Sequence, residues 1–224
     1  MYFEPTKKVA ERYVWSSTRG SSHSKILALV GKNKRVLDIG CATGYLGEAL
    51  KKIGCEVIGI EIDEEAARIA RTKIHDVIIA DVESINHLPY PDGYFNVHIY
   101  GDILEHLKRP DLVLLRFRKY LSNDGRVIAS IPNVANWVIR LNLLRGRFQY
   151  SDIGILDKTH LRFFTLESIK QLFESAGYKI IALDYVLSPP PPKRIMHWLI
   201  YQGIRHFHLW SAEQFIIVAR KARL

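Results

Sequence analysis

The sequence has little cysteine, no long apolar run and no internal repeat. Its two cysteines, Cys41 and Cys55, are too few for a disulfide scaffold or a cysteine metal cluster and favour a reducing, cytoplasmic compartment. No apolar run reaches the ~18 residues that a membrane span needs, and the N-terminus has no apolar stretch typical of a secretory signal. Disulfide-rich and membrane-spanning classes are therefore excluded.

The composition is that of an ordinary globular protein with an uneven charge distribution. With 224 residues, 48% hydrophobic and 25% charged, the chain is expected to form one domain around a single core. Residues 1–112 carry 15 basic and 16 acidic side chains, whereas residues 113–224 carry 17 and 7. This strongly basic second half predicts contact with an anionic partner.

Apolar runs alternate with stretches of helical period, which is typical of βα units around a buried parallel sheet. The strands of the parallel core are expected at 35–39, 56–60, 77–80, 95–100 and 126–130. A late strand pair is expected at 178–186 and 214–218. Helices are expected at 44–53, 64–74, 111–121 and 166–176, with the turn at 122–125 ending the third. Residues 133–164 show no clean period. These patterns predict an α/β fold.

A glycine loop follows the first expected strand, in VLDIGCATGYLGEAL. Gly40 and Gly44 would let the backbone pass close to a ligand, ahead of a helix with open N–H groups. Ala42 and Tyr45 stand where a dinucleotide fingerprint has glycine, and Asp38 would repel a pyrophosphate, so a nicotinamide cofactor fits poorly. An acid here suits a ligand with a cationic amine, as S-adenosylmethionine has. The glycines could also simply shape the turn.

Two more acids end the next two strands. Glu61 could accept hydrogen bonds from ribose hydroxyls, and Asp81 from an exocyclic adenine amine. Each alone is typical of a solvated loop. Together with Asp38 they place three carboxylates at three consecutive strand ends, on the side where α/β sheets bind ligands. This arrangement favours a nucleoside-containing cofactor.

Residues 35–131 resemble a class I S-adenosylmethionine-dependent methyltransferase, of the subgroup that includes ubiquinone-biosynthesis-type and small-molecule O-methyltransferases. VLDIGCATG, GIEID, DVES and GDILEHLKRP carry the resemblance. It implies a Rossmann-like sheet of seven mostly parallel strands, in which a final hairpin makes the last strand antiparallel, and a substrate lid inserted after strand five.

The resemblance also implies a cofactor site. The loop glycines and Cys41 would contact the methionine end, the strand-end acids would hold the ribose and adenine, and the end of strand four would lie under the sulfonium. The implied residues are Asp38, Gly40, Cys41, Ala42, Gly44, Tyr45, Leu46, Glu61, Ile62, Asp81, Val82, Asp102 and Ile103. Family members usually have glycine at position 42. Alanine would cost little there if the backbone is not left-handed, so restoring glycine is expected to be nearly neutral.

His106, in GDILEHLKRP, is a candidate general base because an imidazole pKa near 6.5 suits deprotonation of a hydroxyl at neutral pH. A structural role in a helix turn is equally consistent with its position. The motif differs from the Asn/Asp-Pro-Pro-Tyr of methyltransferases that act on amino nitrogens of bases, which argues against that chemistry. Glu105 beside His106 is a weak indication of a metal, and no metal site is expected.

The segment 133–164 resembles a subgroup of bacterial methyltransferases associated with cell-surface glycan or glycolipid synthesis. The resemblance rests on IPN, GRFQY, GILD and THLRFFT, and on AEQFIIVARK near the end of the chain. His160 is a second candidate base. Alternatively, Asp157 pairs with Arg162 and His160 packs the lid down. The candidates for binding phosphate or carboxylate groups of the acceptor are Arg140, Arg145, Arg147 and Arg162.

The expected organisation is one methyltransferase domain. It comprises an N-terminal cap (1–34), a cofactor-binding core (35–131), a substrate lid (132–165) and a C-terminal helix and hairpin (166–224). Within the last part, residues 193–210 combine aromatic and basic side chains. They could form an interfacial helix on anionic lipid, a homodimer contact, or a helix packed on its own sheet.

The leading functional prediction is methyl transfer from S-adenosylmethionine to an oxygen of a small-molecule, sugar or lipid-linked acceptor, expected to be anionic. The alternatives are an RNA methyltransferase that uses the basic half, and a binding protein that has lost catalysis. A nucleic-acid partner is not favoured, because no RNA-binding module is visible. An oxidoreductase is least supported, given the glycine pattern.

Overall fold

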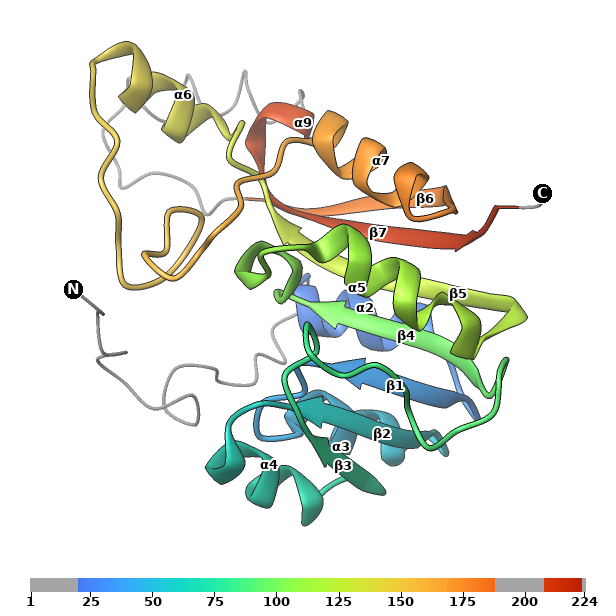
Figure 1. Cartoon of the computed structure of the whole chain (residues 1–224). Helices are drawn as coiled ribbons and strands as arrows, with labels where there is room; N and C mark the ends of the chain where they lie inside the picture. Colours follow the sequence, from blue (N-terminus) through green and yellow to red (C-terminus); the bar gives the residue numbers. More distant parts are fainter. Residues whose placement is uncertain (1–19, 188–207, 223–224) are drawn as a thin grey trace.

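A seven-stranded sheet forms the centre of the protein, in a computed structural model that describes residues 20–187 and 208–222 (Figure 1). The strand order is β3-β2-β1-β4-β5-β7-β6. β7 is antiparallel to β5 and β6, and the other pairings are parallel. The predicted seven-stranded, mostly parallel sheet with an antiparallel last strand is confirmed. The strands are β1 (Arg35–Ile39), β2 (Glu56–Glu61), β3 (Asp76–Ile79), β4 (Phe95–Gly101), β5 (Leu121–Pro132), β6 (Tyr178–Leu187) and β7 (Ala212–Lys221).

Helices cover both faces of this sheet (Figure 1). Ile26, Leu50 and Ala70, from α2, α3 and α4, pack in the core on one face. Phe117 and Phe173, from α5 and α7, pack in the core on the other. Burying both faces explains why the central strands are almost continuously apolar. The helices are α2 (Ser22–Val30), α3 (Tyr45–Lys51), α4 (Glu64–Arg71), α5 (Pro110–Phe117), α6 (Trp137–Leu144), α7 (Leu166–Ser175) and α9 (His208–Ser211), with 3-10 turns η1 (Leu104–His106) and η2 (Arg118–Tyr120).

Local sequence signals predicted some helix ends correctly and others incorrectly. The N-cap predicted at Thr165 is confirmed: its side chain accepts a hydrogen bond from the backbone N–H of Ser168 in a capping box. The prediction of a helix over 111–121 is wrong at its end, because α5 stops at Phe117 and η2 follows. The residues of the expected turn, 122–125, fall within β5. The pairing of β5 with β4 passes from Leu121 directly to Arg126, so these four residues form an irregularity in the strand.

The segment 133–164 contains a helix that its sequence did not reveal. α6 begins at an N-cap, Asn136, whose side chain accepts from the backbone N–H of Val138. Of the α6 side chains, Ile139 is buried whereas Leu143 and Leu144 are exposed, so no apolar stripe of helical period exists to detect. The segment projects from the sheet on the side where β1, β2 and β4 end (Figure 1).

Two expectations fall largely outside the described residues. Positions 1–19 of the N-terminal cap and positions 193–207 of the basic aromatic segment are not described, and α9 holds the remaining 208–210. Among the helices that are described, none has the length and apolar character to cross a membrane.

His98 sits in the middle of the sheet without a hydrogen-bond partner. It is 0% exposed, and neither ring nitrogen has a partner among the described residues. Burial and, to a smaller extent, the charge of Lys221 together lower its pKa from 6.5 to about 3. The ring is therefore neutral in the folded chain at pH values where it is protonated in the unfolded chain.

Because of this difference in pKa, protonation of His98 in the unfolded chain is expected to lower the free energy of unfolding at acidic pH. The substitution His98→Leu should remove this effect. Below pH 6.5 the unfolded chain binds a proton that the folded chain does not. The free energy of unfolding should therefore fall by about 1.4 kcal/mol per pH unit from this group, until pH approaches the folded pKa. Urea unfolding at pH 8 and pH 5 should show His98→Leu gaining about 2 kcal/mol on the wild type between the two. Parallel losses in both proteins would contradict it.

Candidate active site

The loop between β1 and α3 turns tightly because three residues have left-handed backbone. They are Gly40 (φ 75°), Ala42 (φ 47°) and Gly44 (φ 73°). A Cβ at Gly40 would lie 2.9 Å from Cδ1 of Ile103, and one at Gly44 would lie 3.0 Å from Cα of Ala70. Glycine therefore lets the loop pass between α4 and the chain after β4. Alanine was expected to cost little at position 42 if the backbone there is not left-handed. The backbone of Ala42 is left-handed, so that condition is not met.

The Glu61 carboxylate holds this loop to the end of β2. Its Oε2 accepts from the backbone N–H of Ala42 at 2.8 Å. Its Oε1 accepts from the N–H groups of Ile62 and Asp63, both at 2.9 Å. A carboxylate has about four acceptor positions, so about one remains for a ligand hydroxyl, where two had been expected.

Asp38 lies beneath the same loop, at 3% exposure. Burial and, to a smaller extent, the charge of Glu61 together raise its pKa from 3.8 to about 7. Cys41 packs in the core beside it, where burial and the two carboxylates also raise the pKa of its thiol. A cationic group placed near Asp38 would return it to its ionised form, as the sequence argument requires.

The remaining cofactor candidates surround this loop. Asp81 accepts from the backbone N–H of Glu83 and from the hydroxyl of Ser84, each at 2.8 Å. Val82 is buried and Ile62 is exposed. Leu46 is buried in the core, while the ring of Tyr45 meets His23 edge-on at 4.9 Å between centroids.

At the end of β4, Asp102 is linked to the last strand of the sheet. Its Oδ1 accepts from Nε2 of Gln214 on β7 at 2.9 Å, and its backbone N–H donates to Oγ of Ser130 at 3.1 Å. Burial raises the Asp102 pKa, while hydrogen bonds from Ser130 and Gln214 oppose the rise. The residue has left-handed backbone (φ 52°), a strained conformation that is common at functional sites.

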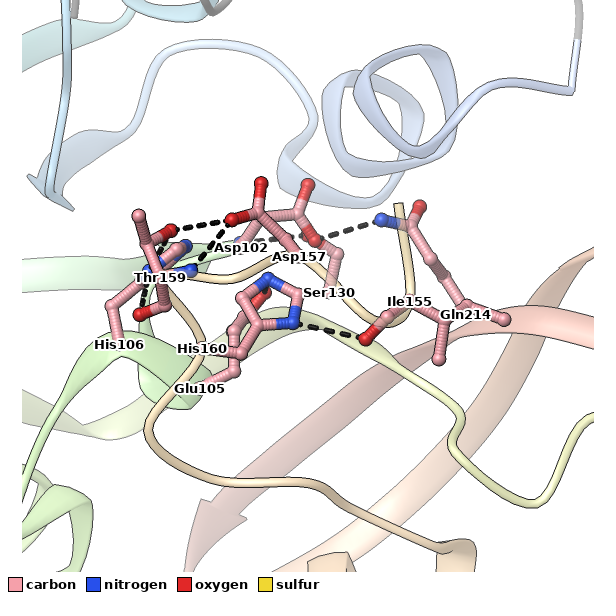
Figure 2. A network of polar contacts seen from close by, with 9 residues as sticks. All are labelled: Asp102, Glu105, His106, Ser130, Ile155, Asp157, Thr159, His160 and Gln214. Carbon is pink, nitrogen blue, oxygen red and sulfur yellow. Dashed lines mark hydrogen bonds and ion pairs between the residues drawn. The ribbon is translucent and has the colours of Figure 1, made fainter. Parts of the chain in front are cut away.

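Two histidines and a buried carboxyl meet immediately beyond Asp102 (Figure 2). The rings of His106 and His160 meet edge-on, with centroids 4.8 Å apart. Nε2 of His160 lies 4.0 Å from Oε1 of Glu105. Glu105 is 1% exposed, and neither carboxyl oxygen has a hydrogen-bond partner among the described residues. Burial raises its pKa well above the usual range, and the charge of Asp102 adds to the rise.

Backbone carbonyls orient both imidazoles. Nδ1 of His160 lies 3.0 Å from the carbonyl oxygen of Ile155, and Nδ1 of His106 lies 3.2 Å from that of Thr159. Since a carbonyl only accepts, each Nδ1 carries a hydrogen, and Nε2 holds the lone pair in the neutral ring. Glu105, His106 and His160 offer ligand atoms within 4.8 Å of one another. With Nδ1 so held, they could bind a divalent cation, where the sequence predicted no metal.

These groups line a cavity of about 170 Å³. Its walls are acidic, and no lysine or arginine of residues 20–187 and 208–222 is among its lining residues. The lining is Asp102, Glu105, His106, Pro132, Ile153, Gly154, Ile155, Asp157, His160, Glu213 and Gln214. A second cavity, of about 400 Å³, shares Ile155 and Glu213 with the first and extends under α6.

The four candidate acceptor arginines do not share one environment. Arg147 lines the larger cavity. Arg140 stacks on the ring of Trp210 at 4.8 Å, and Arg145 bonds to the carbonyl of Leu141. Arg162 donates to the carbonyl of Lys108 at 2.5 Å.

Several residues that shape the site have no recognisable signal in the sequence. Thr159 bonds through its backbone N–H and its hydroxyl to Oδ1 of Asp157, which fixes the turn that presents His160. Asn133 and Asn136 each donate to the carbonyl of Ala212 at 3.0 Å, joining the end of β5 to the start of β7. Partners of this kind lie about 75 residues apart, and no local pattern signals them.

The left-handed backbone at Ala42 predicts that Ala42→Gly is stabilising rather than neutral. Releasing about 1–2 kcal/mol of left-handed strain should outweigh about 0.8 kcal/mol for the lost methyl burial, a net gain of about 0.5 kcal/mol in the free energy of unfolding. Ala49→Gly, within α3, is the matched control and should lose about 1 kcal/mol. Equal losses for both in urea unfolding would contradict the left-handed conformation.

Comparison with known proteins agrees with this geometry. The profile of a family described as "Methyltransferase domain" matches residues 15–183. A ubiquinone biosynthesis O-methyltransferase from Psychrobacter arcticus is 27% identical over 199 residues, covering 80% of this chain and 71% of that protein. Another, from Proteus mirabilis, is 31% identical over 105 residues, covering 45% of this chain and 42% of its own length.

Solved structures share the fold. A SAM dependent methyltransferase from Archaeoglobus fulgidus has a TM-score of 0.63 at 21% identity, covering 91% of this chain and 96% of its own. One from Aquifex aeolicus has a TM-score of 0.66 at 15% identity, covering 99% and 100%. The predicted enzyme class and cofactor are confirmed. Because the family profile spans most of the chain, this protein belongs to the class I S-adenosylmethionine-dependent methyltransferases.

Proposed function

We propose that this enzyme methylates a hydroxyl oxygen of an acceptor that enters the cavity beside His160. The observation that carries the proposal is the placement of His160, with Nδ1 held by a carbonyl and Nε2 4.0 Å from the buried Glu105. The Psychrobacter arcticus relative, an O-methyltransferase by name, supports oxygen as the accepting atom.

The residues around the glycine loop suit S-adenosylmethionine, which supplies a methyl group activated on a sulfonium. Asp38 would face the cationic amine, since its carboxyl is buried and its pKa is raised to about 7. Glu61 would use its remaining acceptor position for a ribose hydroxyl. Asp81 and Val82 would border the adenine.

His160 is the proposed general base. When Nε2 takes the hydroxyl proton, the ring becomes cationic. A cation beside Glu105 would oppose the rise in the pKa of that carboxyl, and the resulting carboxylate would stabilise the ring. His106 meets the His160 ring edge-on at 4.8 Å and would hold its orientation. The rest of the catalytic effect would come from fixing the hydroxyl in line with the methyl group.

The acidic cavity wall changes the expected acceptor. Asp102, Glu105, Asp157 and Glu213 all line the cavity or its entrance, and an anionic group there would be repelled. The reacting end of the acceptor is therefore neutral. Any anionic part would lie in the larger cavity, near Arg147.

The larger cavity favours an acceptor rich in hydrogen-bonding groups. It is lined by Asn142, Gln149, Ser151 and Arg147. Leu144, Arg145 and Tyr150 are exposed and are not among the residues that line it. Exposed apolar, aromatic and basic side chains suit an acceptor carried at a lipid surface. Phenols, sugars and lipid-linked sugars are thus the classes to test.

Glu61→Ala is predicted to damage both the cofactor site and the fold. Removing the carboxylate leaves three backbone N–H groups without their acceptor. Affinity for S-adenosylmethionine should fall by at least tenfold, and the free energy of unfolding by about 2 kcal/mol. Calorimetric titration and urea unfolding measure the two. Glu64→Ala, on the exposed first turn of α4, should change neither by more than a small amount.

His160→Gln is predicted to lower kcat by about 10²–10⁴-fold with little change in the KM for S-adenosylmethionine, because it removes the base and not the cofactor site. Transfer of a labelled methyl group to phenolic, sugar and lipid-linked sugar acceptors measures this, with mass spectrometry locating the methyl. The wild-type kcat should rise with pH as the imidazole loses its proton, and that dependence should vanish in the variant.

The matched control is His87→Gln, which alters an exposed histidine that does not line the cavity and should keep wild-type kcat. Methylation of nitrogen alone, or wild-type kcat in His160→Gln, would refute the proposal.

A further inference from the structure

A third cavity, of about 600 Å³, lies at the other end of the sheet from the active site. Its walls include the start of the regular part of β5, the end of β7 and η2. β5 links the two ends: Pro132 lines the cavity beside His160 and Arg126 lines this one. Six residues of strand separate them, which is about 20 Å. The cavity is therefore not part of the methyl-transfer site.

Four cationic residues are among those that line this cavity: Arg118, Arg126, Arg220 and Lys221. The one acidic residue in its lining is Asp124. Among the described residues, no carboxylate oxygen lies within the 4.0 Å of an ion pair from any of the four cations. We call this the basic cavity.

Backbone carbonyl groups hold the Arg118 side chain in place near the other cations. Arg118 is fixed by two carbonyls, since Nε donates to Gly177 and Nη2 to Ala222, each at 3.2 Å. Across the last two strands, Lys179 stands directly opposite Arg220 in the register. Like charges opposite one another destabilise a sheet, so this end of the sheet carries a cost that an anion would relieve.

The pKa of Lys221 is also affected by the positive charge nearby. It is lowered by burial and then by the charge of Arg118, while Asp92 acts in the opposite direction. A bound anion would reverse this effect by favouring the charged lysine.

We propose that the basic cavity binds a phosphate-bearing anion. Arginine forks and a lysine around one space suit the several oxygens and the multiple charge of a phosphate better than a single carboxylate. A volume of about 600 Å³ falls in the range of small-molecule sites. The ligand is either a free phosphate compound or a phosphate headgroup at a membrane surface. The inference is independent of the acceptor proposed above.

The test uses the full chain and inorganic pyrophosphate, titrated by calorimetry at low ionic strength, with acetate for comparison. Pyrophosphate should bind and acetate should not. Saturating S-adenosylhomocysteine should leave the pyrophosphate affinity unchanged, since the sites are separate. The double variant Arg126→Gln/Lys221→Gln removes two cations whose side chains make no hydrogen bond or ion pair within the described part of the chain, and it should weaken binding at least tenfold.

The matched control is Lys51→Gln/Arg68→Gln, which removes the same charge from α3 and α4 and should leave the affinity within about twofold. Thermal unfolding verifies that each variant folds, and pyrophosphate should raise the melting temperature of the wild type and the control only. Absence of pyrophosphate binding, or equal weakening by both double variants, would overturn the proposal, because the latter is what diffuse attraction predicts.

Vesicles identify the source of the phosphate. Cosedimentation with phosphatidylglycerol but not phosphatidylcholine vesicles, lost in Arg126→Gln/Lys221→Gln and kept in the control, would support a lipid headgroup. Pyrophosphate binding without vesicle binding would support a free phosphate compound. Vesicle binding that survives in the cavity variant while pyrophosphate binding is absent would count against the basic cavity.

Discussion

The hydrogen bonds of Glu61 are the constraint on which the cofactor side of the enzyme depends. One carboxylate joins the N–H of Ala42, in the loop after β1, to the N–H groups that follow β2. The loop can take its left-handed turn because this acceptor replaces the hydrogen bonds that the turn removes. That turn brings Asp38 and the loop N–H groups to the same edge of the sheet as Asp102. A ligand bound there would share Glu61 with the backbone, so cofactor binding and loop conformation are coupled.

A second clamp sets the acceptor side. Asn133 and Asn136 bond to the carbonyl of Ala212, and Gln214 reaches from β7 to Asp102. Through these contacts the final antiparallel strand anchors both the segment after β5 and the end of β4. In the cavity between them, burial raises the pKa of Glu105 and of Glu213, and the charge of Asp102 adds to both shifts. Groups that must exchange protons at neutral pH are commonly tuned in this way.

The excess of basic residues in the second half of the chain does not produce a basic substrate site, although the composition suggested one. The basic second half predicted an anionic ligand at the substrate site, yet the cavity there is acidic. Four of the cations of that half instead surround a cavity at the opposite end of β5. β5 and β7 run the full length of the sheet, so residues close together in the sequence of these strands serve two separate surfaces. The net charge of a segment therefore indicates a preference for anions, but it does not identify the part of the structure that would bind them.

The sequence by itself determined the βα order, the glycine loop and the three strand-end acids. Each of these is a local feature: apolar runs mark buried strands, glycines mark left-handed turns, and parallel strands all place their carboxyl ends at one edge. Thr165 could likewise be identified as a cap because its partner, Ser168, is three residues away.

Tertiary structure alone decided the left-handed backbone at Ala42, the existence of α6 and the meeting of Glu105 with His160. Alanine gives no local signal for positive φ, and the loop adopts it because Glu61, from another strand, binds its N–H. α6 lacks an apolar stripe because Ile139 is its one buried residue, while Leu143 and Leu144 are exposed. Glu105 and His160 stand 55 positions apart in the sequence, and only the folded turn at Asp157 and Thr159 brings them within 4.0 Å. Contacts of this kind depend on how separate elements pack. The sequence around each of the two contacting residues contains no pattern that predicts this packing.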